Sequence, residues 1–274
     1  MTKVALVTGA SSGIGEATAL ALHEAGYTVY AAARRVSRMD DLAARGVRVL
    51  SMDVTLDSSM VSGVSQILEE AGRIDVLVNN AGYGSFGAFE DVPLSEGKYQ
   101  FEVNLFGLAR LVQLVAPHMR AQGSGRIVNV SSIGGKIYEP LGGWYHSTKF
   151  AVEGLSDSLR VELKPFGVDV VVIQPGAIKT EWADIAMDNL LKTSGSGAYA
   201  STAQAMTRLQ RFADRASSPS VVASAILKAV SVRRPRTRYA IGGGARPILF
   251  LRRVLSDRAF DAMMLFALRR LAAA

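Results

Sequence analysis

A tyrosine and a lysine stand four positions apart in the segment Tyr145-His146-Ser147-Thr148-Lys149. If this segment is helical, the phenol and the ammonium lie on the same helix face. An ordinary tyrosine has a pKa of about 10, and a nearby cation favours the phenolate and lowers that pKa. Such a tyrosine can pass a proton to or from a substrate oxygen. Taken alone, this spacing is common by chance, and a surface pair is the competing interpretation.

A glycine-rich segment near the amino end has the residue types that bind phosphate groups. Gly9, Gly13 and Gly15 stand in the order Thr8-Gly9-Ala10-Ser11-Ser12-Gly13-Ile14-Gly15, between an apolar run and a helical pattern. Small residues let the backbone approach a pyrophosphate, and a helix amino terminus offers free N–H groups and partial positive charge. A tight strand–helix turn without a ligand is the alternative.

The end of the next apolar run favours one nicotinamide cofactor over the other. NAD-binding folds usually place Asp or Glu about 20 residues after the glycines, where it bonds the ribose 2′-hydroxyl. This chain instead has three alanines followed by Arg34 and Arg35. A pair of guanidinium groups suits a 2′-phosphate, so the sequence predicts NADP(H). The alternative is a pair of solvated charges at the end of a strand.

Short apolar runs alternate with longer amphipathic stretches along the chain. Strands are expected over residues 3–8, 28–33, 47–53, 75–80, 126–132, 168–175 and 238–242. Helices are expected near 13–25, 39–45, 57–71, 95–120, 145–165 and 220–230. Because the strand runs are almost wholly apolar and alternate with helices, the sequence predicts an α/β fold with a doubly wound parallel sheet.

Further motifs occur in a fixed order, namely Asn79-Asn80-Ala81-Gly82, Asn104, Ser132 and Pro175-Gly176. With the glycine turn and Tyr145-x-x-x-Lys149, they resemble the short-chain dehydrogenase/reductase family over about residues 3–242. The resemblance implies one Rossmann domain spanning 1–274 with a parallel sheet of about seven strands. It also implies an enzyme that moves a hydride between NADP(H) and an alcohol or ketone. Residues 238–242 and the tail after them resemble the retinol and 17β-hydroxysteroid dehydrogenase-like branch.

This resemblance assigns four catalytic residues. Tyr145 is the general acid or base, and Lys149 bonds the nicotinamide ribose and lowers the tyrosine pKa. Ser132, 13 positions before Tyr145, polarises the substrate oxygen, with Ser131 as the alternative. Asn104 distorts its helix and holds a water that completes a proton relay to Lys149, although a buried amide that satisfies neighbouring backbone is also an interpretation.

The same resemblance assigns the cofactor contacts, which run from the phosphate turn to the carboxamide of the nicotinamide. Asp53 is expected to close its strand and bond the adenine amino group, with Val54 beside it. The full set is Gly9, Ser11, Ser12, Gly13, Ile14, Gly15, Arg34, Arg35, Asp53, Val54, Asn80, Ala81, Gly82, Tyr145, Lys149, Pro175, Gly176, Ile178 and Thr180. His146 is expected to be a surface or loop-packing residue. No metal site is expected, because the chain has no cysteine and its three histidines are far apart.

Bulky side chains near the expected pocket favour a small lipophilic alcohol or ketone as substrate. They are Tyr83, Phe86, Phe89, Tyr138, Trp144 and Trp182, each of which could instead pack the core or lie on the surface. Residues 181–218, which include the flexible string 193–197, are expected to form a mobile substrate lid. Apolar residues on more than one face of the helices over 95–120 and 145–165 suggest a homodimer or homotetramer.

The charge of this chain is concentrated in its tail. Residues 233–274 contain ten arginines and only two acidic residues, Asp257 and Asp261, which gives a net charge of +8. The first 232 residues have a net charge of −1, so the total is +7. No basic patch with interleaved aromatic residues is visible, so nucleic-acid binding is not expected. With no targeting segment and no apolar run of about 18 residues, the sequence predicts a cytoplasmic protein.

Residues 243–274 form a basic amphipathic extension with an apolar stripe at Phe260, Met263, Met264, Ala267, Leu268 and Leu271. Asp257 is expected to cap its second helix. Packing of this stripe on the domain or on a partner copy is the favoured interpretation, and contact with an anionic membrane is the alternative. An NADP(H)-binding regulator and a peripheral membrane protein therefore remain alternatives to the enzyme.

Overall fold

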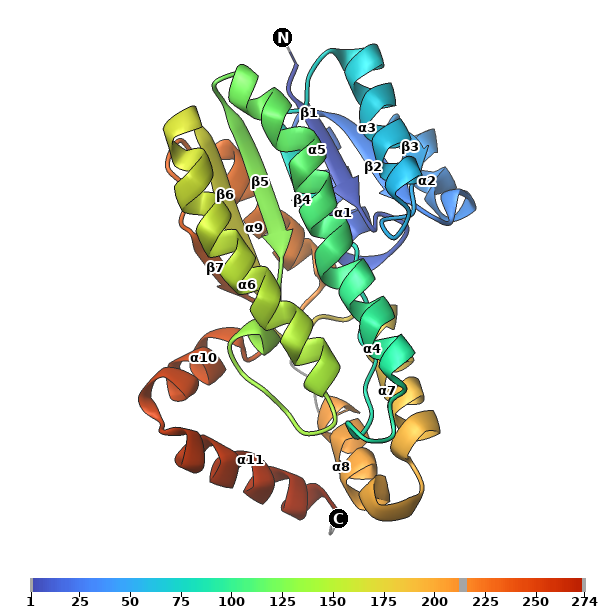
Figure 1. The fold of residues 1–274 in the computed structure, drawn as a ribbon, viewed down its shortest axis with the longest axis vertical. Helices are drawn as coiled ribbons and strands as arrows, with labels where there is room; N and C mark the ends of the chain where they lie inside the picture. Colours follow the sequence, from blue (N-terminus) through green and yellow to red (C-terminus); the bar gives the residue numbers. More distant parts are fainter. Residues whose placement is uncertain (1, 212–215, 273–274) are drawn as a thin grey trace.

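Seven parallel strands form one sheet at the centre of the protein, in the order β3-β2-β1-β4-β5-β6-β7 (Figure 1). We describe the fold from a computed structural model, which covers residues 2–211 and 216–272. The strands are β1 (Val4–Thr8), β2 (Thr28–Ala33), β3 (Arg48–Ser51), β4 (Val76–Asn79), β5 (Gly125–Val130), β6 (Val168–Pro175) and β7 (Arg238–Ile241). The predicted single-domain α/β Rossmann fold with a doubly wound sheet is confirmed.

Two apolar cores lie on the two faces of this sheet, because successive strand residues point to opposite sides. Ala5 and Val7 join one core and Val4 and Leu6 the other. The first core is covered by α1 (Gly13–Glu24), α2 (Asp40–Ala44) and α9 (Pro219–Ser231). The second is covered by α3 (Asp57–Ala71), α5 (Gly107–Ala121) and α6 (Gly143–Leu163). Sheets buried on both faces have strands that are mostly apolar, as β1, β2 and β4 are here.

The helix expected over 95–120 is interrupted at the residue that was expected to distort it. It divides into α4 (Leu94–Phe101), a π-helical turn over Glu102–Phe106 and α5. Asn104 lies in that turn and is buried. A π-helical turn inserts an extra residue into the helix and is frequent at functional sites.

The strand expected over 47–53 ends earlier, at Ser51, so the expectation that Asp53 closes it is wrong. The Asp53 carboxylate accepts hydrogen bonds from the backbone N–H of Thr55 at 2.9 Å and from its hydroxyl at 2.8 Å. Such a bond to the backbone two residues on stabilises a turn in place of strand pairing.

The region expected to be a lid forms two helices, α7 (Glu181–Ser194) and α8 (Ala200–Arg211), which pack on each other. Within the string 193–197, which was expected to be flexible, Ser194 is fully buried. Its hydroxyl donates to Asp91 at 2.6 Å and accepts from the backbone N–H of Ala88 at 2.9 Å. These bonds attach the end of α7 to the segment 88–91. Residues 212–215 of the expected lid lie outside the described residues.

The tail forms α10 (Ala245–Val254) and α11 (Asp257–Ala272), and α11 packs across α8 below the sheet (Figure 1). Phe260 and Leu268 are buried there, while Met264 and Leu271 are partly buried, so the apolar stripe packs on its own domain. Ser256 takes the capping position expected for Asp257, because its hydroxyl accepts from the backbone N–H of the residue three positions on.

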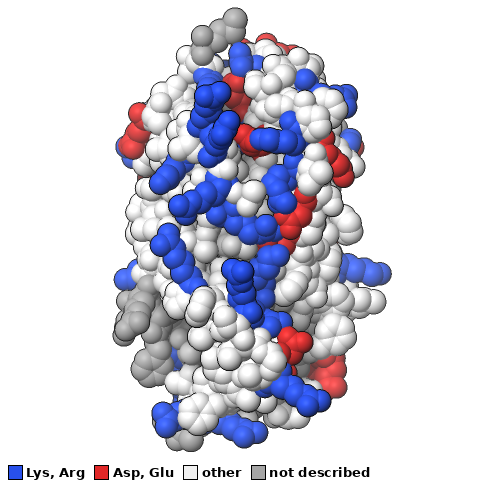
Figure 2. Space-filling model, turned by 90° about the vertical axis from the view of Figure 1, so that its left-hand side faces the viewer, with Lys and Arg blue, Asp and Glu red and all other residues white. Residues whose placement is uncertain are grey.

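Lys and Arg side chains gather over much of the face that Figure 2 shows. On the tail, Phe250 and Phe266 stay exposed among the arginines. Within residues 2–211 and 216–272, no helix has the length and apolar character needed to span a membrane.

Candidate active site

A cavity of about 870 Å³ opens beyond the carboxyl ends of the strands. In open α/β sheets, ligands bind in the crevice at this end. Most of the residues expected at the site line this cavity, namely Gly9, Ser12, Gly13, Ile14, Asn80, Ala81, Gly82, Ser132, Tyr145, Lys149, Pro175, Gly176, Ile178 and Thr180. One continuous cavity thus joins the glycine turn to the tyrosine and lysine of α6.

Ser132, Tyr145 and Lys149 come together from two elements. Tyr145 and Lys149 lie one turn apart on α6, and both are buried. Ser132 follows the end of β5, where its hydroxyl accepts from the backbone N–H of Gly134 at 3.0 Å. The Lys149 ammonium donates to the carbonyl of Val130 at 3.0 Å and lies 6.0 Å from the centre of the Tyr145 ring.

Burial controls the protonation of this group. It raises the pKa of the Tyr145 phenol to about 12, although a hydrogen bond with Ser132 acts in the opposite direction. Burial also lowers the pKa of Lys149 to about 8, against the attraction of Glu153. The expected lowering of the tyrosine pKa by Lys149 is therefore not found, because loss of solvent disfavours the phenolate more strongly. At neutral pH the phenol carries its proton.

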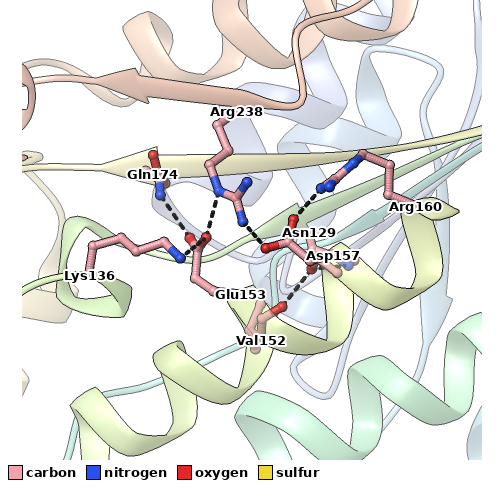
Figure 3. Close-up of polar contacts among 9 residues, drawn as sticks. Asn129, Lys136, Val152, Glu153, Asp157, Arg160, Gln174 and Arg238 are labelled. Atoms are coloured by element: carbon pink, nitrogen blue, oxygen red, sulfur yellow. Dashed lines mark hydrogen bonds and ion pairs between the residues drawn. The ribbon is translucent and has the colours of Figure 1, made fainter.

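Glu153 lies one turn beyond Lys149 on α6, at the centre of a buried polar network (Figure 3). Its carboxylate accepts from Arg238 Nε at 2.8 Å and from Gln174 Nε2 at 2.9 Å, and pairs with Lys136 at 3.4 Å. These donors come from β7, from β6 and from the loop after β5. They satisfy the carboxylate in its buried position, and its attraction acts on the ammonium group of Lys149.

Asn104 connects the loop after β4 to α6. Its Oδ1 accepts from the backbone N–H of Tyr83 at 3.0 Å. Its Nδ2 donates to the Tyr83 carbonyl at 2.9 Å and to the Thr148 hydroxyl at 3.1 Å. The buried amide thus satisfies the hydrogen-bonding groups of the neighbouring backbone, which was one of the two interpretations of Asn104 from the sequence.

The glycine turn has the close backbone packing that a dinucleotide site requires. Gly9 and Gly13 adopt φ values of +66° and +59°, which residues other than glycine rarely adopt. A Cβ on Gly9 would lie 2.8 Å from the Cα of Ala81, and one on Gly15 would lie 2.2 Å from the Gly9 carbonyl oxygen. The Asn80 amide donates to the Thr8 carbonyl at 3.0 Å and fixes the turn. The amino end of α1 therefore opens into the cavity and fits a pyrophosphate.

Other expected cofactor residues lie outside this cavity. Arg34 and Arg35 follow the end of β2 and are exposed, and Arg34 donates to the Tyr99 hydroxyl at 3.0 Å. Ser11 lines an adjoining hollow of about 820 Å³, together with Arg38 and Glu181, which form an ion pair at 2.6 Å. Gly15, Asp53 and Val54 do not line the cavity either. The ends of β2 and β3 are adjacent, so the arginines and Asp53 share one edge of the sheet.

His146 fixes the loop between Ser132 and Tyr145. One ring nitrogen lies 3.0 Å from the Gly134 carbonyl, and the other accepts from the backbone N–H of Glu139 at 3.0 Å. The interpretation of His146 as a loop-packing residue is confirmed. Burial lowers the pKa of its imidazole, which keeps the ring neutral.

Comparisons with known proteins agree with this geometry. A family model described as short chain dehydrogenase matches residues 3–190. A 3-ketodihydrosphingosine reductase from Bacteroides thetaiotaomicron is 37% identical over 240 residues, 88% of either chain. The crystal structure of a short-chain dehydrogenase from Streptomyces avermitilis is 38% identical with a TM-score of 0.80, covering 91% of each chain.

The chain belongs to the short-chain dehydrogenase/reductase family.

Members of this family with bound cofactors are among the similar structures. A metagenomic short-chain oxidoreductase in complex with NADP is 28% identical with a TM-score of 0.68, covering 86% of this chain and 95% of that one. A short-chain dehydrogenase/reductase from Burkholderia phymatum in complex with NAD is 26% identical with a TM-score of 0.78, covering 96% and 95%. The protein is therefore an oxidoreductase that acts on CH–OH or C=O groups.

The substrate end of this short-chain dehydrogenase/reductase is apolar, but most of the aromatic residues singled out in the sequence do not line it. Phe86 and Trp182 do so, and both lie against the Tyr145 ring. Tyr83, Phe89, Tyr138 and Trp144 lie elsewhere. Further lining comes from residues that the sequence did not single out, among them Ile137, Glu139, Met206, Leu209 and Ile248. No short-range signal marks Met206, Leu209 or Ile248, because α8 and α10 reach the cavity only through the tertiary fold.

Proposed function

We propose that this protein is an NADP(H)-dependent reductase of lipophilic ketones, with Tyr145 as the proton donor. One observation carries the proposal. The protonated phenol of Tyr145 lies beside Ser132 in a cavity whose far end is the glycine turn. Around the phenol the lining is largely apolar, with Phe86, Trp182 and Leu209. The relative named for a keto compound supports a carbonyl substrate.

The side chains of this site suit reduction in particular. A bound nicotinamide would supply the hydride, which leaves negative charge on the carbonyl oxygen. Tyr145 can give its proton to that oxygen, and Ser132 can donate a second hydrogen bond to it. Because both hydroxyls are held by the fold before substrate arrives, little reorganisation is needed when the charge develops.

Lys149 is placed to hold the sugar next to the nicotinamide. Its ammonium uses one proton on the Val130 carbonyl, and two others remain to donate to hydroxyl groups in the cavity. Asn104 holds the loop 81–83 against α6 beside this lysine, and a water-mediated proton relay through it is part of the proposal.

The cofactor would extend from Lys149 toward the glycine turn and the ends of β2 and β3. Gly9, Ser12 and Gly13 at the start of α1 would receive the pyrophosphate, and Asp53 with Val54 would flank the adenine. Pro175, Gly176, Ile178 and Thr180 would surround the carboxamide. Arg34 and Arg35, with no carboxylate in the preceding three residues, support the 2′-phosphate of NADP(H).

The segments beyond the sheet would form the cover of the substrate. Met206 and Leu209 of α8 and Ile248 of α10 already line the cavity, which supports a covering role for residues 181–218 and for the extension 243–274. The finer resemblance to retinol and 17β-hydroxysteroid dehydrogenases stays a prediction.

A cofactor titration followed by a ketone panel tests this proposal. We expect wild type to bind NADPH at least tenfold more tightly than NADH, and Arg34→Ala or Arg35→Ala to reduce that ratio. Arg45→Ala is the control, because Arg45 is exposed but pairs with Glu24 away from the site. Equal binding of both cofactors by wild type would refute the NADP(H) preference. Binding of NADPH without turnover of any ketone would favour a cofactor-binding regulator.

A further inference from the structure

The first residue of α7, Glu181, forms an ion pair with an arginine that is far away in the sequence. Arg38 lies in the 3₁₀ turn Val36–Met39, three residues beyond Arg35. Its terminal nitrogens donate to the two oxygens of the Glu181 carboxylate, Nη2 at 2.6 Å and Nη1 at 3.1 Å. This two-point geometry fixes the orientation of both side chains as well as their distance. The pair therefore connects the segment after β2 to the start of α7.

The residues on either side of Glu181 lie toward the two functional ends of the cavity. Thr180 packs on the glycine turn, where its Cγ2 would lie 3.0 Å from a Cβ on Gly13. Both of these residues line the cavity and the adjoining hollow, so their contact lies where the two spaces meet. Trp182 lies against Tyr145, with ring centres 5.1 Å apart. The ion pair thus holds a turn of chain that contacts both the start of α1 and the proposed proton donor.

The start of α7 is stabilised by this carboxylate and not by a capping side chain. Thr180 is the N-cap residue of α7, but in the part of the chain that the structure describes its hydroxyl makes no capping hydrogen bond. The negative charge of Glu181 supplies part of that stabilisation, because a carboxylate in the first turn favours the positive end of the helix dipole. Hydrogen bonds from Arg38 lower the pKa of this carboxyl, and the charge of Arg35 acts in the same direction. The carboxylate is therefore ionised at neutral pH and attracts both arginines.

We propose that the Arg38–Glu181 ion pair is a clasp that holds the start of α7 on the glycine turn and slows the release of the bound dinucleotide. Arg38 acts through Glu181, as a positioning residue, and not on the 2′-phosphate. The inference rests on dinucleotide binding at the glycine turn, which is part of the proposed function, but not on the preference for NADP(H).

The exposure of the ion pair suits a clasp that opens in every catalytic cycle. The side chains of Arg38 and Glu181 are 38% and 55% exposed, so the pair can separate without opening the apolar core. An exposed ion pair changes an equilibrium only about two- to fivefold. The clasp therefore slows release of the cofactor without trapping it.

Stopped-flow displacement of the reduced cofactor, followed by its fluorescence, measures release without turnover. We expect Arg38→Ala and Glu181→Gln each to release NADPH about two- to fivefold faster than wild type. NADH should be released faster by the same factor, because the clasp does not contact the 2′-phosphate. Arg45→Ala is the matched control, since Arg45 forms an exposed ion pair with Glu24 at 2.7 Å away from the site, and it should leave both rates unchanged.

Exchange of the two charges separates the clasp from a direct contact of Arg38 with the cofactor. Arg38→Glu and Glu181→Arg should each speed release, and the double variant should restore both rates to within about twofold of wild type. Faster release of NADPH alone would assign Arg38 to the 2′-phosphate and overturn the clasp. So would wild-type release rates in all of these variants, which would leave the proposed function intact. Failure of wild type to bind either dinucleotide would overturn both.

Discussion

The imidazole of His146 accepts a hydrogen bond from the backbone N–H of Glu139 at 3.0 Å. This bond ties the residue after Tyr145 to the loop that begins at Ser132. The other ring nitrogen reaches the Gly134 carbonyl at 3.0 Å, so one neutral ring connects two points of that loop. The geometry between the serine and the tyrosine therefore depends on a residue that lines the same cavity but has no expected role in hydride or proton transfer.

Acidification should weaken this connection. Because burial lowers the pKa of His146, the unfolded chain takes up a proton near pH 6.5 while the folded protein does not. The unfolded state binds more protons over this range, so stability falls as the pH drops below about 6.5. We expect urea unfolding to show this loss between pH 7 and pH 5. In His146→Leu the loss should be smaller, with stability at pH 7 reduced by about 1–3 kcal/mol, because the Glu139 N–H loses its acceptor.

His118→Gln provides the control for that experiment, because His118 is exposed on α5. The His118→Gln variant should lose as much stability between pH 7 and pH 5 as wild type does. An unchanged pH slope in His146→Leu would show that another group titrates.

Glu153 should set the pH range over which Lys149 keeps its proton. The Glu153 charge raises the lysine pKa, and burial lowers it to about 8. Glu153→Gln removes the raising influence, so Lys149 should lose its proton at a lower pH. If Lys149 holds the cofactor, the alkaline decline in NADPH affinity should move to lower pH in this variant. A fluorescence titration of NADPH from pH 6 to pH 10 measures the shift.

Asp157→Asn is the matched control, because Asp157 also pairs with Arg238, at 2.6 Å, yet lies a further turn from Lys149. It should leave the pH profile of NADPH binding unchanged. Glu153→Gln should also lower the free energy of unfolding by about 3 kcal/mol, since Arg238 and Lys136 lose a buried partner. Equal pH profiles for both variants would contradict an electrostatic role of Glu153.

Self-association is expected through the face that α5 and α6 leave uncovered. Phe106, directly before α5, and Phe150, on α6, are 53% and 45% exposed, whereas other residues of these two helices pack in the core. Exposed aromatic residues on such a face favour a homodimer or homotetramer. The molar mass that light scattering measures should fall toward that of the monomer in Phe150→Glu. It should stay at the wild-type value in Phe266→Glu, whose change lies on α11. A wild-type monomer at micromolar concentration would exclude this interface.

The sheet and the glycine turn could be predicted because both depend on neighbouring residues in the sequence. Apolar runs such as residues 3–8 and 75–80 reveal buried parallel strands directly. The end of β3 could not be placed, because the side chain of Asp53 bonds Thr55 and starts a turn that the apolar pattern does not reveal. The burial of Ser194 could not be predicted for a similar reason, since its hydroxyl bonds Asp91 across more than 100 residues of sequence.

At the site, the identity of the side chains was accessible from the sequence, but their electrostatics were not. Spacing alone placed Tyr145 and Lys149 on one helix face. It suggested that the lysine lowers the tyrosine pKa, whereas burial by Phe86 and Trp182 reverses the direction. Glu139 was missed because a single acidic residue in a loop carries no periodic signal. Its place in the cavity wall follows only from the fold around it.

The role of Tyr145 is tested most directly by a single-turnover measurement of hydride transfer. Tyr145→Phe keeps the aromatic ring that packs on Phe86 and Trp182 and removes only the hydroxyl. With saturating NADPH and a ketone that wild type reduces, we expect the rate to fall about 10²–10⁴-fold while NADPH affinity stays within about twofold. A variant that keeps more than about a tenth of the wild-type rate would contradict the assignment of Tyr145 as the proton donor.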